Sequence, residues 1–260
     1  PTGILFFHRS PSEKGLSPDG DPEPPPNKTG RVPPEITGPL EAETWRDSLR
    51  SAPIWQMSAS YFVCGMTTFV MSVHFIPYAQ SQGVSPGLAA IIFGFMMGLN
   101  VLGALGSGYL SDKVGDTKNW LALAYFIRGI AYLLLLTLPA PLNLWIFAVF
   151  AGFSWVATPV LTSSLTADVY GLKALGTISG LTFMFHQFGG FSSVLLAGLL
   201  FDVTGSYTIP FAIAGALLVP ASLSAFSIKE RKYSVRYQAH PTSVTSSAAD
   251  VSRDLPYSAN

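Results

Sequence analysis

The sequence predicts an all-α membrane protein with six transmembrane helices, and three observations support this prediction. Of the 260 residues, 49% are hydrophobic and 12% are charged, whereas a soluble domain carries roughly 25% charged residues. Six apolar runs each approach the roughly 20 residues that cross a bilayer. Lysine and arginine gather in alternate connections between these runs, which is the charge pattern of a membrane protein with a defined orientation.

The six apolar runs lie between two polar segments and are separated by short connections that carry Pro, Gly or charged residues. Backbone groups in lipid must be bonded within their own segment, so each run is expected to be a helix. A soluble helical core is the rival interpretation, but its helices would each show a polar face, and residues 125–138 show almost none. We place the spans at Ile54–Ala79, Pro86–Leu110, Trp120–Leu138, Leu142–Leu165, Leu175–Phe201 and Tyr207–Ile228.

Polar segments flank the six spans. Residues 1–50 are rich in Pro, Gly and charge and bury too little apolar surface to fold, so we expect a largely disordered cytosolic linker. Residues 230–260, rich in Ser and Thr, are expected to be a disordered cytosolic tail. The six-helix transmembrane domain then comprises residues 51–229. Because the chain begins with Pro1, we expect a processed N-terminus or a fragment.

The cationic residues predict the orientation of the helices. Loops 80–85, 139–141 and 202–206 contain no Lys or Arg, and these loops are expected to face away from the cytosol. Both termini are therefore expected in the cytosol, and the plasma membrane is the expected location. A glycan on Asn27, in the sequon that ends at Thr29, would overturn this topology. The other side carries Arg46, Arg50, Lys113, Lys118, Lys173, Lys229, Arg231, Lys232 and Arg236.

Composition and motifs exclude several other functions. The formal net charge is zero, so nucleic acid is not an expected partner. The single cysteine, Cys64, cannot form an internal disulfide. We find no nucleotide-binding loop, no metal-spaced His/Cys cluster and no nucleophile–base pair. No catalytic residue, metal or cofactor is therefore expected, and the chain is not expected to be an enzyme.

The connection after the second span carries a motif of Gly, Asp, Lys and Gly at fixed spacing. Gly108 permits close helix contact, Asp112 can cap a neighbouring helix N-terminus, and Lys113 is a cytosolic anchor. With Gly115, these residues resemble the loop signature G-x-L-[SA]-D-[RK]-x-G of the major facilitator superfamily, in its second-half copy. Its position after the second of six spans makes the resemblance specific.

Three other stretches resemble the same superfamily. Residues 6–18 resemble the exit of its sixth helix into the central cytosolic loop, and residues 168–180 resemble its tenth-to-eleventh loop. Residues 201–207 resemble the eleventh-to-twelfth turn of its monocarboxylate and oxalate–formate branch. The resemblance implies one half of a twelve-helix bundle, helices seven to twelve, with the substrate bound between the two halves. The expected partners are a small solute, the lipid bilayer, and either a missing N-terminal half or a second copy.

The chain departs from this branch at two positions. Oxalate–formate-type transporters carry a carboxylate-binding arginine in the eighth helix, eight residues before the loop aspartate, where this chain has Ala104. They also carry a lysine in the eleventh helix, near His186 and Gln187 of this chain. Neither fixed cation is retained, so the resemblance does not establish a dicarboxylate substrate.

His186 is a candidate for the substrate pathway because it lies near the middle of the fifth span. An imidazole there can bind a substrate, couple transport to protons near neutral pH, or bridge two helices. Gln187 lies about 100° further round the helix and is a candidate for a second contact. The face that includes His186 is expected to line a cavity, and its members are Ser179, Thr182, His186, Gly190, Ser193 and Ala197.

Three uncharged residues on the other spans are further candidates for the pathway. Thr67 belongs to a stripe of the first span with Ser60, Cys64, Met71 and His74, which can line a cavity or pack against another helix. Asn100 lies on the glycine-rich second span, where Gly94 and Gly98 have the spacing of close helix packing. Thr158 lies on the fourth span, on one stripe with Ser154 and Thr162, and beside Pro159, which frees a backbone carbonyl and can kink that helix. This stripe can line a site or simply pack against another helix.

Arg128 lies in the middle of the third span, and the acidic residues lie outside the six apolar cores. Its partners are therefore backbone carbonyls, water, a residue of the missing half or an anionic ligand. Structural pairing and substrate contact both remain open. The lack of an intramembrane carboxylate argues against a carboxylate proton relay.

Together these observations predict secondary active transport, by symport or antiport, of a small organic solute by alternating access. A monocarboxylate or another anion is among the candidates. The expected pathway residues are His186, Gln187, Thr67, Asn100, Thr158 and Arg128. The alternatives are a six-helix membrane protein with a binding or regulatory role and a fragment that does not transport.

Overall fold

The computed structural model describes residues 38–238. The resemblance at residues 6–18, the sequon at Asn27 and the tail 239–260 lie outside these residues. Six helices within the described part are long and apolar enough to cross a membrane, which confirms the predicted fold class. Their bounds are α3 Ala52–Ser81, α4 Pro86–Val114, α5 Thr117–Thr137, α6 with α7 Leu142–Tyr170, α8 Leu175–Thr204 and α9 Thr208–Phe226.

Local sequence signals start and end these helices. Pro86 occupies the first turn of α4, where a missing N–H costs nothing, and Ser85 accepts a hydrogen bond from the backbone of Leu88. Gly115 ends α4 and Gly171 ends α7, both with positive φ, which glycine adopts without steric cost. Most of the helix ends therefore fall close to the breakers noted in the sequence.

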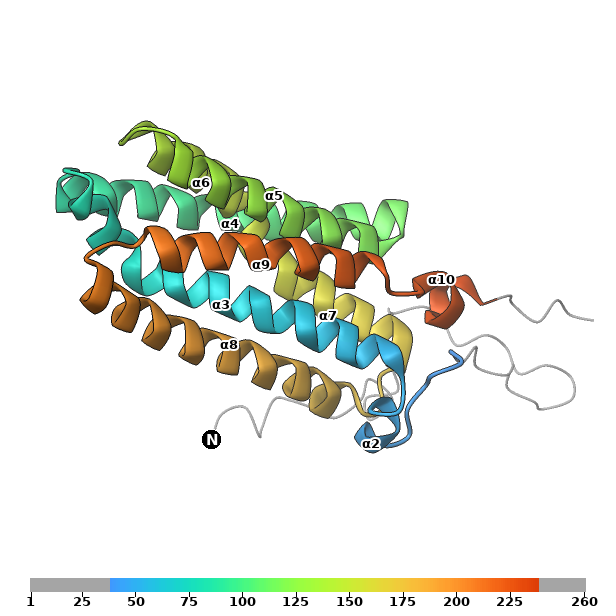
Figure 1. Cartoon of the computed structure of the whole chain (residues 1–260). Coiled ribbons are helices and arrows are strands. Elements are labelled where there is room, and N and C mark those ends of the chain that lie inside the picture. The colour runs from blue at the N-terminus through green and yellow to red at the C-terminus, as the bar shows by residue number, and fades with distance from the viewer. Residues whose placement is uncertain (1–37, 239–260) are drawn as a thin grey trace, which may run out of the picture. The chain divides into compact units, whose positions relative to one another are not determined.

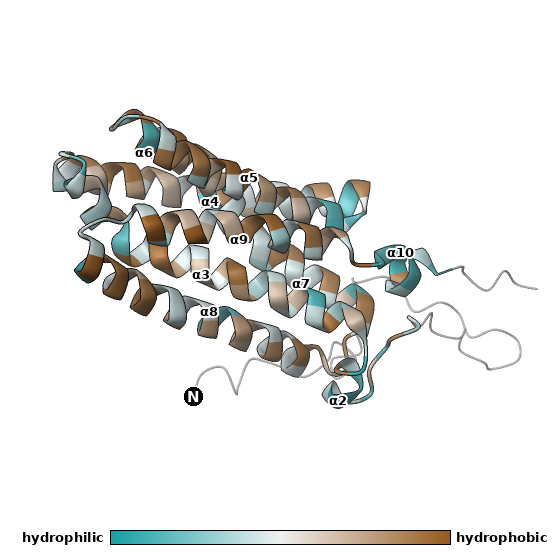
Figure 2. Ribbon diagram, in the orientation of Figure 1, coloured by the Kyte–Doolittle hydropathy of each residue, from teal (hydrophilic) through white to brown (hydrophobic). Residues whose placement is uncertain are grey.

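The six spans lie side by side, and α3 is the central one. It packs chiefly against α8 on one side and α9 on the other, as Figure 1 shows. The pairs α5 with α9 and α4 with α6 make the other large contacts. In Figure 2 the spans are mostly hydrophobic, while the short helices α2 (Trp45–Ser48) and α10 (Glu230–Tyr233) are the most hydrophilic elements.

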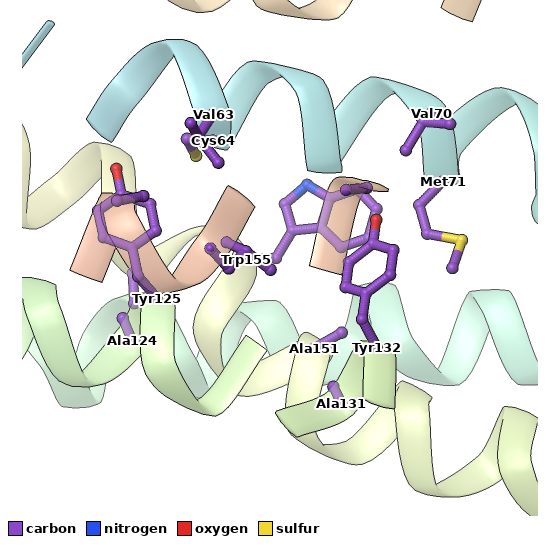
Figure 3. Packing of buried hydrophobic residues seen from close by; sticks show 14 of the residues in the cluster. Val63, Cys64, Val70, Met71, Ala124, Tyr125, Ala131, Tyr132, Ala151 and Trp155 are labelled. Atoms are coloured by element: carbon purple, nitrogen blue, oxygen red, sulfur yellow. The ribbon is translucent and has the colours of Figure 1, made fainter. Parts of the chain in front are cut away.

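A continuous apolar core fills the space between α3, α5 and α6. In Figure 3 Cys64 of α3, Tyr125 and Tyr132 of α5, and Trp155 of α6 all point into this space. The Tyr132 hydroxyl donates to the backbone carbonyl of Thr67 at 2.7 Å. Such bonds join the helices where apolar packing in lipid has no hydrophobic driving force.

The helices α4 and α8 are the least buried spans of the described chain. Close packing was one interpretation of Gly94 and Gly98, but a side-chain carbon added at either would meet nothing within 4 Å. By contrast, a Cβ at Gly103 would collide with the backbone of Phe153 in α6. The α4–α6 contact therefore uses Gly103, and the Gly94–Gly98 face is open.

Ordered structure extends beyond the predicted six-helix domain at both ends. The Ala42 N–H donates to the Tyr170 carbonyl at 3.0 Å. After α9 the chain forms α10 and the 3-10 helix Val235–Tyr237 (η3). The composition predicted disorder here, but Glu230 is fully buried. Its carboxylate accepts from the first backbone N–H groups of α5, at 3.0 and 2.8 Å, and this long-range contact orders the segment.

Candidate functional site

The fourth span is broken at Val156, which separates α6 (Leu142–Trp155) from α7 (Ala157–Tyr170). The sequence explains the break, because Pro159 has no N–H to donate to the Trp155 carbonyl four residues earlier. The interruption thus falls just before Pro159, where the sequence allowed a kink. An unbonded carbonyl buried in this core would cost about 1–3 kcal/mol, so the freed backbone groups need other partners.

Arg128 of α5 supplies donors to the freed carbonyls. Its side chain is 1% exposed, and its Nη2 donates to the carbonyls of Ser154 at 2.6 Å and Trp155 at 3.1 Å. The same nitrogen lies 3.1 Å from the Thr158 hydroxyl. Of the partners left open by the sequence, the structure shows backbone carbonyls, and it adds a hydroxyl group of this chain that the sequence had not indicated.

The other terminal nitrogen of Arg128 faces α3. Nη1 donates to the Cys64 sulfur at 3.4 Å and to the Thr67 hydroxyl at 3.3 Å. The Cys64 thiol in turn lies 3.1 Å from the Thr158 hydroxyl. Within the described residues, Nε is the one guanidinium nitrogen of Arg128 that is buried without a partner. The guanidinium therefore joins α3, α5, α6 and α7 around the break.

Asn100 of α4 bonds the freed donor on the opposite side of the break. Its Oδ1 accepts the Val156 N–H at 3.1 Å, and its Nδ2 donates to the Met96 carbonyl of its own helix at 3.1 Å. Four predicted pathway residues, Thr67, Asn100, Thr158 and Arg128, thus meet at the broken helix. They bond to other groups of the protein and hold the two halves of the fourth span in place.

His186 is buried, with 6% of its surface exposed, and aromatic rings surround it. Its ring centroid lies 4.7 Å from that of Tyr61 and 5.7 Å from that of Phe69. Phe183 stacks on it at 5.5 Å with 9° between the ring planes. The imidazole also lies within interaction range of the Cys64 thiol, which connects His186 to the Arg128 cluster.

The stripe of α8 that contains His186 packs against α3. A Cβ at Gly65 would collide with the His186 carbonyl, and one at Gly189 with the Phe62 carbonyl, so the two backbones are in close contact. Periodicity correctly placed the stripe on one face, but most of that face contacts a neighbouring helix. Gln187 lies off this face and is exposed, with its Oε1 3.3 Å from His186 Nδ1.

A cavity of about 380 Å³ lies beside the break, between α3, α7 and α8. Ser179 and Thr182 belong to the face of α8 that the sequence predicted to line a cavity, and Thr162 belongs to a polar stripe of the fourth span. Tyr61 and Ser163 carried no signal, because a single hydroxyl in an apolar run is common. The lining residues are Tyr61, Pro159, Thr162, Ser163, Ser179, Gly180, Thr182 and Phe183.

The loop motif between α4 and α5 has a different set of contacts from the one expected. Asp112 was expected to cap a helix, but that role belongs to Glu230, whereas Asp112 is exposed and 3.8 Å from Arg236. Lys113 donates to the Tyr109 hydroxyl at 3.2 Å. Gly108 makes no close backbone contact to another helix in the described chain. The motif is held by the C-terminal segment, because Arg236 also donates to the Ser111 carbonyl at 2.9 Å.

Known membrane transporters are similar to this chain in sequence. The family model for the Major Facilitator Superfamily matches residues 2–194. The uncharacterized MFS-type transporter YcxA of Bacillus subtilis (strain 168) is 29% identical over 188 residues, 70% of this chain and 44% of that protein. Monocarboxylate transporter 13 of Rattus norvegicus is 31% identical over 155 residues, 59% of this chain and 36% of that protein.

Among solved structures, the fucose:proton symporter FucP of E. coli matches with a TM-score of 0.57 at 19% identity. The match covers 70% of this chain and 45% of that one, and it shows a shared fold. Six apolar spans in this arrangement define an integral membrane protein of the major facilitator type. The chain belongs to the Major Facilitator Superfamily, and it spans less than half the length of YcxA and of monocarboxylate transporter 13.

Proposed function

We propose that the chain is the C-terminal six-helix half of a secondary active transporter that moves a small organic solute by alternating access. Family membership supports transport, and the chain's coverage of 44% and 36% of its relatives supports a half. A second six-helix unit, either an N-terminal half or a second copy, completes the pathway. The open faces of α4 and α8 are the surfaces against which it packs.

The observation that carries this proposal is the hydroxyl-lined cavity beside the broken span. Transporter sites are commonly built where a helix is discontinuous, since the irregular backbone can line a cavity. Here Pro159 both breaks the helix and lines the cavity, and Arg128 with Asn100 bonds the freed backbone groups. The site is thus held by rigid elements.

Orientation and coupling complete the proposal. The described ends and the cationic connections 113–118 and 171–174 lie at one end of the bundle, which we place in the cytosol of a plasma-membrane protein. His186 is the candidate for proton coupling in symport or antiport. Relatives named as monocarboxylate transporters make a monocarboxylate one candidate solute.

An uptake screen tests the proposal. Full-length protein in proteoliposomes is supplied with labelled carboxylates, sugars and amino acids, with and without an imposed pH gradient. Accumulation of one solute, abolished in protein lacking the second half, is the expected result. No accumulation of any solute would contradict transport. Proton coupling would be rejected if His186→Gln left uptake and its pH dependence unchanged.

A further inference from the structure

We infer that this half of the transporter recognises an uncharged, hydrogen-bonding group on a flat or ring-shaped solute, and that it does not hold a carboxylate. The inference rests on the proposed function, because it assigns the cavity between α3, α7 and α8 to the solute. It concerns the part of the solute that this half contacts. The printed names of the relatives, which include monocarboxylate transporters, do not predict an uncharged solute group of this kind.

Two residues that line the cavity carry hydroxyl oxygens without a hydrogen-bond partner in the described part of the chain. Thr162 is 3% exposed, yet its Oγ1 has no hydrogen-bond partner, and the same holds for the buried Ser179 Oγ. Both residues line the cavity, one from α7 and the other from α8. Buried polar atoms are almost always bonded, so two unbonded hydroxyls on facing helices indicate a polar group that binds between them.

The charge of the cavity argues against a carboxylate. Its lining residues include five hydroxyl-bearing side chains and no Lys, Arg, His, Asp or Glu. A carboxylate taken out of water is strongly disfavoured unless a cation offsets its desolvation, and hydroxyls alone do not supply that charge. A neutral hydroxyl, carbonyl or amide loses much less solvation and can both accept from and donate to the same hydroxyls.

The buried Arg128 side chain forms hydrogen bonds with protein groups at the broken helix. Arg128 is the Lys or Arg nearest the middle of the described spans, and it does not line the cavity. Both terminal nitrogens donate to groups at the broken helix, with the Ser154 carbonyl 2.6 Å away. Turning the guanidinium toward a solute would leave the freed carbonyls without it. The site thus differs from one in which an arginine fork binds a carboxylate.

Two aromatic rings, tilted by 51° to one another, line the cavity. They belong to Tyr61 and Phe183, and their ring centroids lie 6.3 Å apart. Phe183 stacks on His186 with 9° between the ring planes, so contact with the imidazole restricts the orientation of the Phe183 ring. Flat apolar faces pack on such rings, and a volume of about 380 Å³ suits a small organic molecule.

Matched pairs of probes test the inference in the full-length protein purified in detergent. Nicotinamide and nicotinate share a ring and differ in charge, and benzyl alcohol and benzoate form a second pair. Binding is measured by equilibrium dialysis of labelled compounds. The neutral member of at least one pair is expected to bind more than about 10-fold tighter than its anion, since the lining of this cavity offers the anion no Lys or Arg.

Two variants locate the binding in the cavity. Thr162→Val and Ser179→Ala each remove one hydroxyl and are expected to weaken binding of the neutral probe by about 5- to 10-fold, as loss of one hydrogen bond predicts. Ser192→Ala is the matched control, since the exposed Ser192 hydroxyl bonds its own helix at Phe188. It should leave binding unchanged. The two variants test the same site, so one that folds poorly does not remove the test.

The outcomes separate this inference from the proposed function. Tighter binding of the anions, no binding of any of the four probes, or binding unaffected by Thr162→Val and Ser179→Ala would overturn the inference. Uptake of an anion into proteoliposomes together with those results would leave transport standing. Tight, variant-sensitive binding of a neutral probe without uptake of any solute would instead support the inference and contradict transport.

Discussion

The contact between Asn100 and the broken fourth span gives the sharpest prediction. Asn100→Ala removes the acceptor of the Val156 N–H, which then lies buried at the break without a partner. Such an orphan costs about 1–3 kcal/mol in soluble proteins, whereas interhelical hydrogen bonds in membranes average about 0.6 and reach about 1.7 kcal/mol. We expect a loss near 1–2 kcal/mol, which lowers the unfolding midpoint by about 2–8 °C.

The single cysteine of the chain supplies the assay. Cys64 is fully buried, so a thiol-reactive dye reports unfolding of the chain purified in detergent. Ser107→Ala is the control on the same helix, because the Ser107 hydroxyl donates to the Ala104 carbonyl of α4 itself. If Asn100→Ala were as mild as Ser107→Ala, the reasoning about the break would be refuted.

A double-mutant cycle tests the cause of this loss. Pro159→Ala restores a backbone N–H that can bond the Trp155 carbonyl, so the fourth span can become continuous and Val156 can bond within its own helix. In that background, Asn100→Ala should cost less than it does in the native sequence. Equal costs in the two backgrounds would mean that Asn100 acts independently of the break.

Three further predictions concern the loop between α4 and α5 and the C-terminal segment. Glu230→Gln should lower stability by about 1 kcal/mol, because a neutral amide replaces the carboxylate at the α5 N-terminus; a thermal unfolding midpoint equal to that of the native chain would contradict this role. Gly115→Ala should cost about 1–2 kcal/mol in the same assay, since φ is 75° and the new Cβ would lie 2.8 Å from the Tyr237 hydroxyl; an unchanged midpoint would show that the turn tolerates a side chain. The hydrogen bond from Arg231 lowers the pKa of Asp116 below its ordinary 3.8, so this pair stabilises the fold above that pH and loses its effect as the pH falls through the lowered pKa. Asp116→Asn should therefore make the unfolding midpoint fall less steeply as the pH is lowered, by a small amount because the pair is exposed. An unaltered pH dependence would show that this pair does not contribute to stability.

The six spans and the break in the fourth could be predicted because their causes are local. Apolar length marks a span, and the missing N–H of Pro159 marks the break. The partners of the freed groups could not be predicted, since Arg128 and Asn100 come from other helices and meet the break only after packing. Glu230 likewise reaches the start of α5 across 113 residues of sequence separation.

Periodicity placed residues on a common face but did not say what that face contacts. The stripe with His186 was expected to line a cavity, and most of it packs against α3 through Gly65 and Gly189. Ser179 and Thr182 of the same stripe do line the cavity that the structure shows, together with Thr162 of α7, which the sequence marked only as part of a polar stripe. Whether a face lines a cavity or packs against a helix depends on the neighbouring helices, and the sequence pattern of one helix does not contain that information.

Alternating access is the central claim, and accessibility of the cavity from both sides of the membrane tests it most directly. Ser163 lines the cavity and is exposed, so Ser163→Cys can be introduced into full-length protein that lacks other accessible cysteines. A membrane-impermeant maleimide is then added to right-side-out and to inside-out vesicles. Labelling from both sides, with rates that a transported solute shifts in opposite directions, is the expected result. Labelling from one side alone, whatever solute is present, would contradict the account.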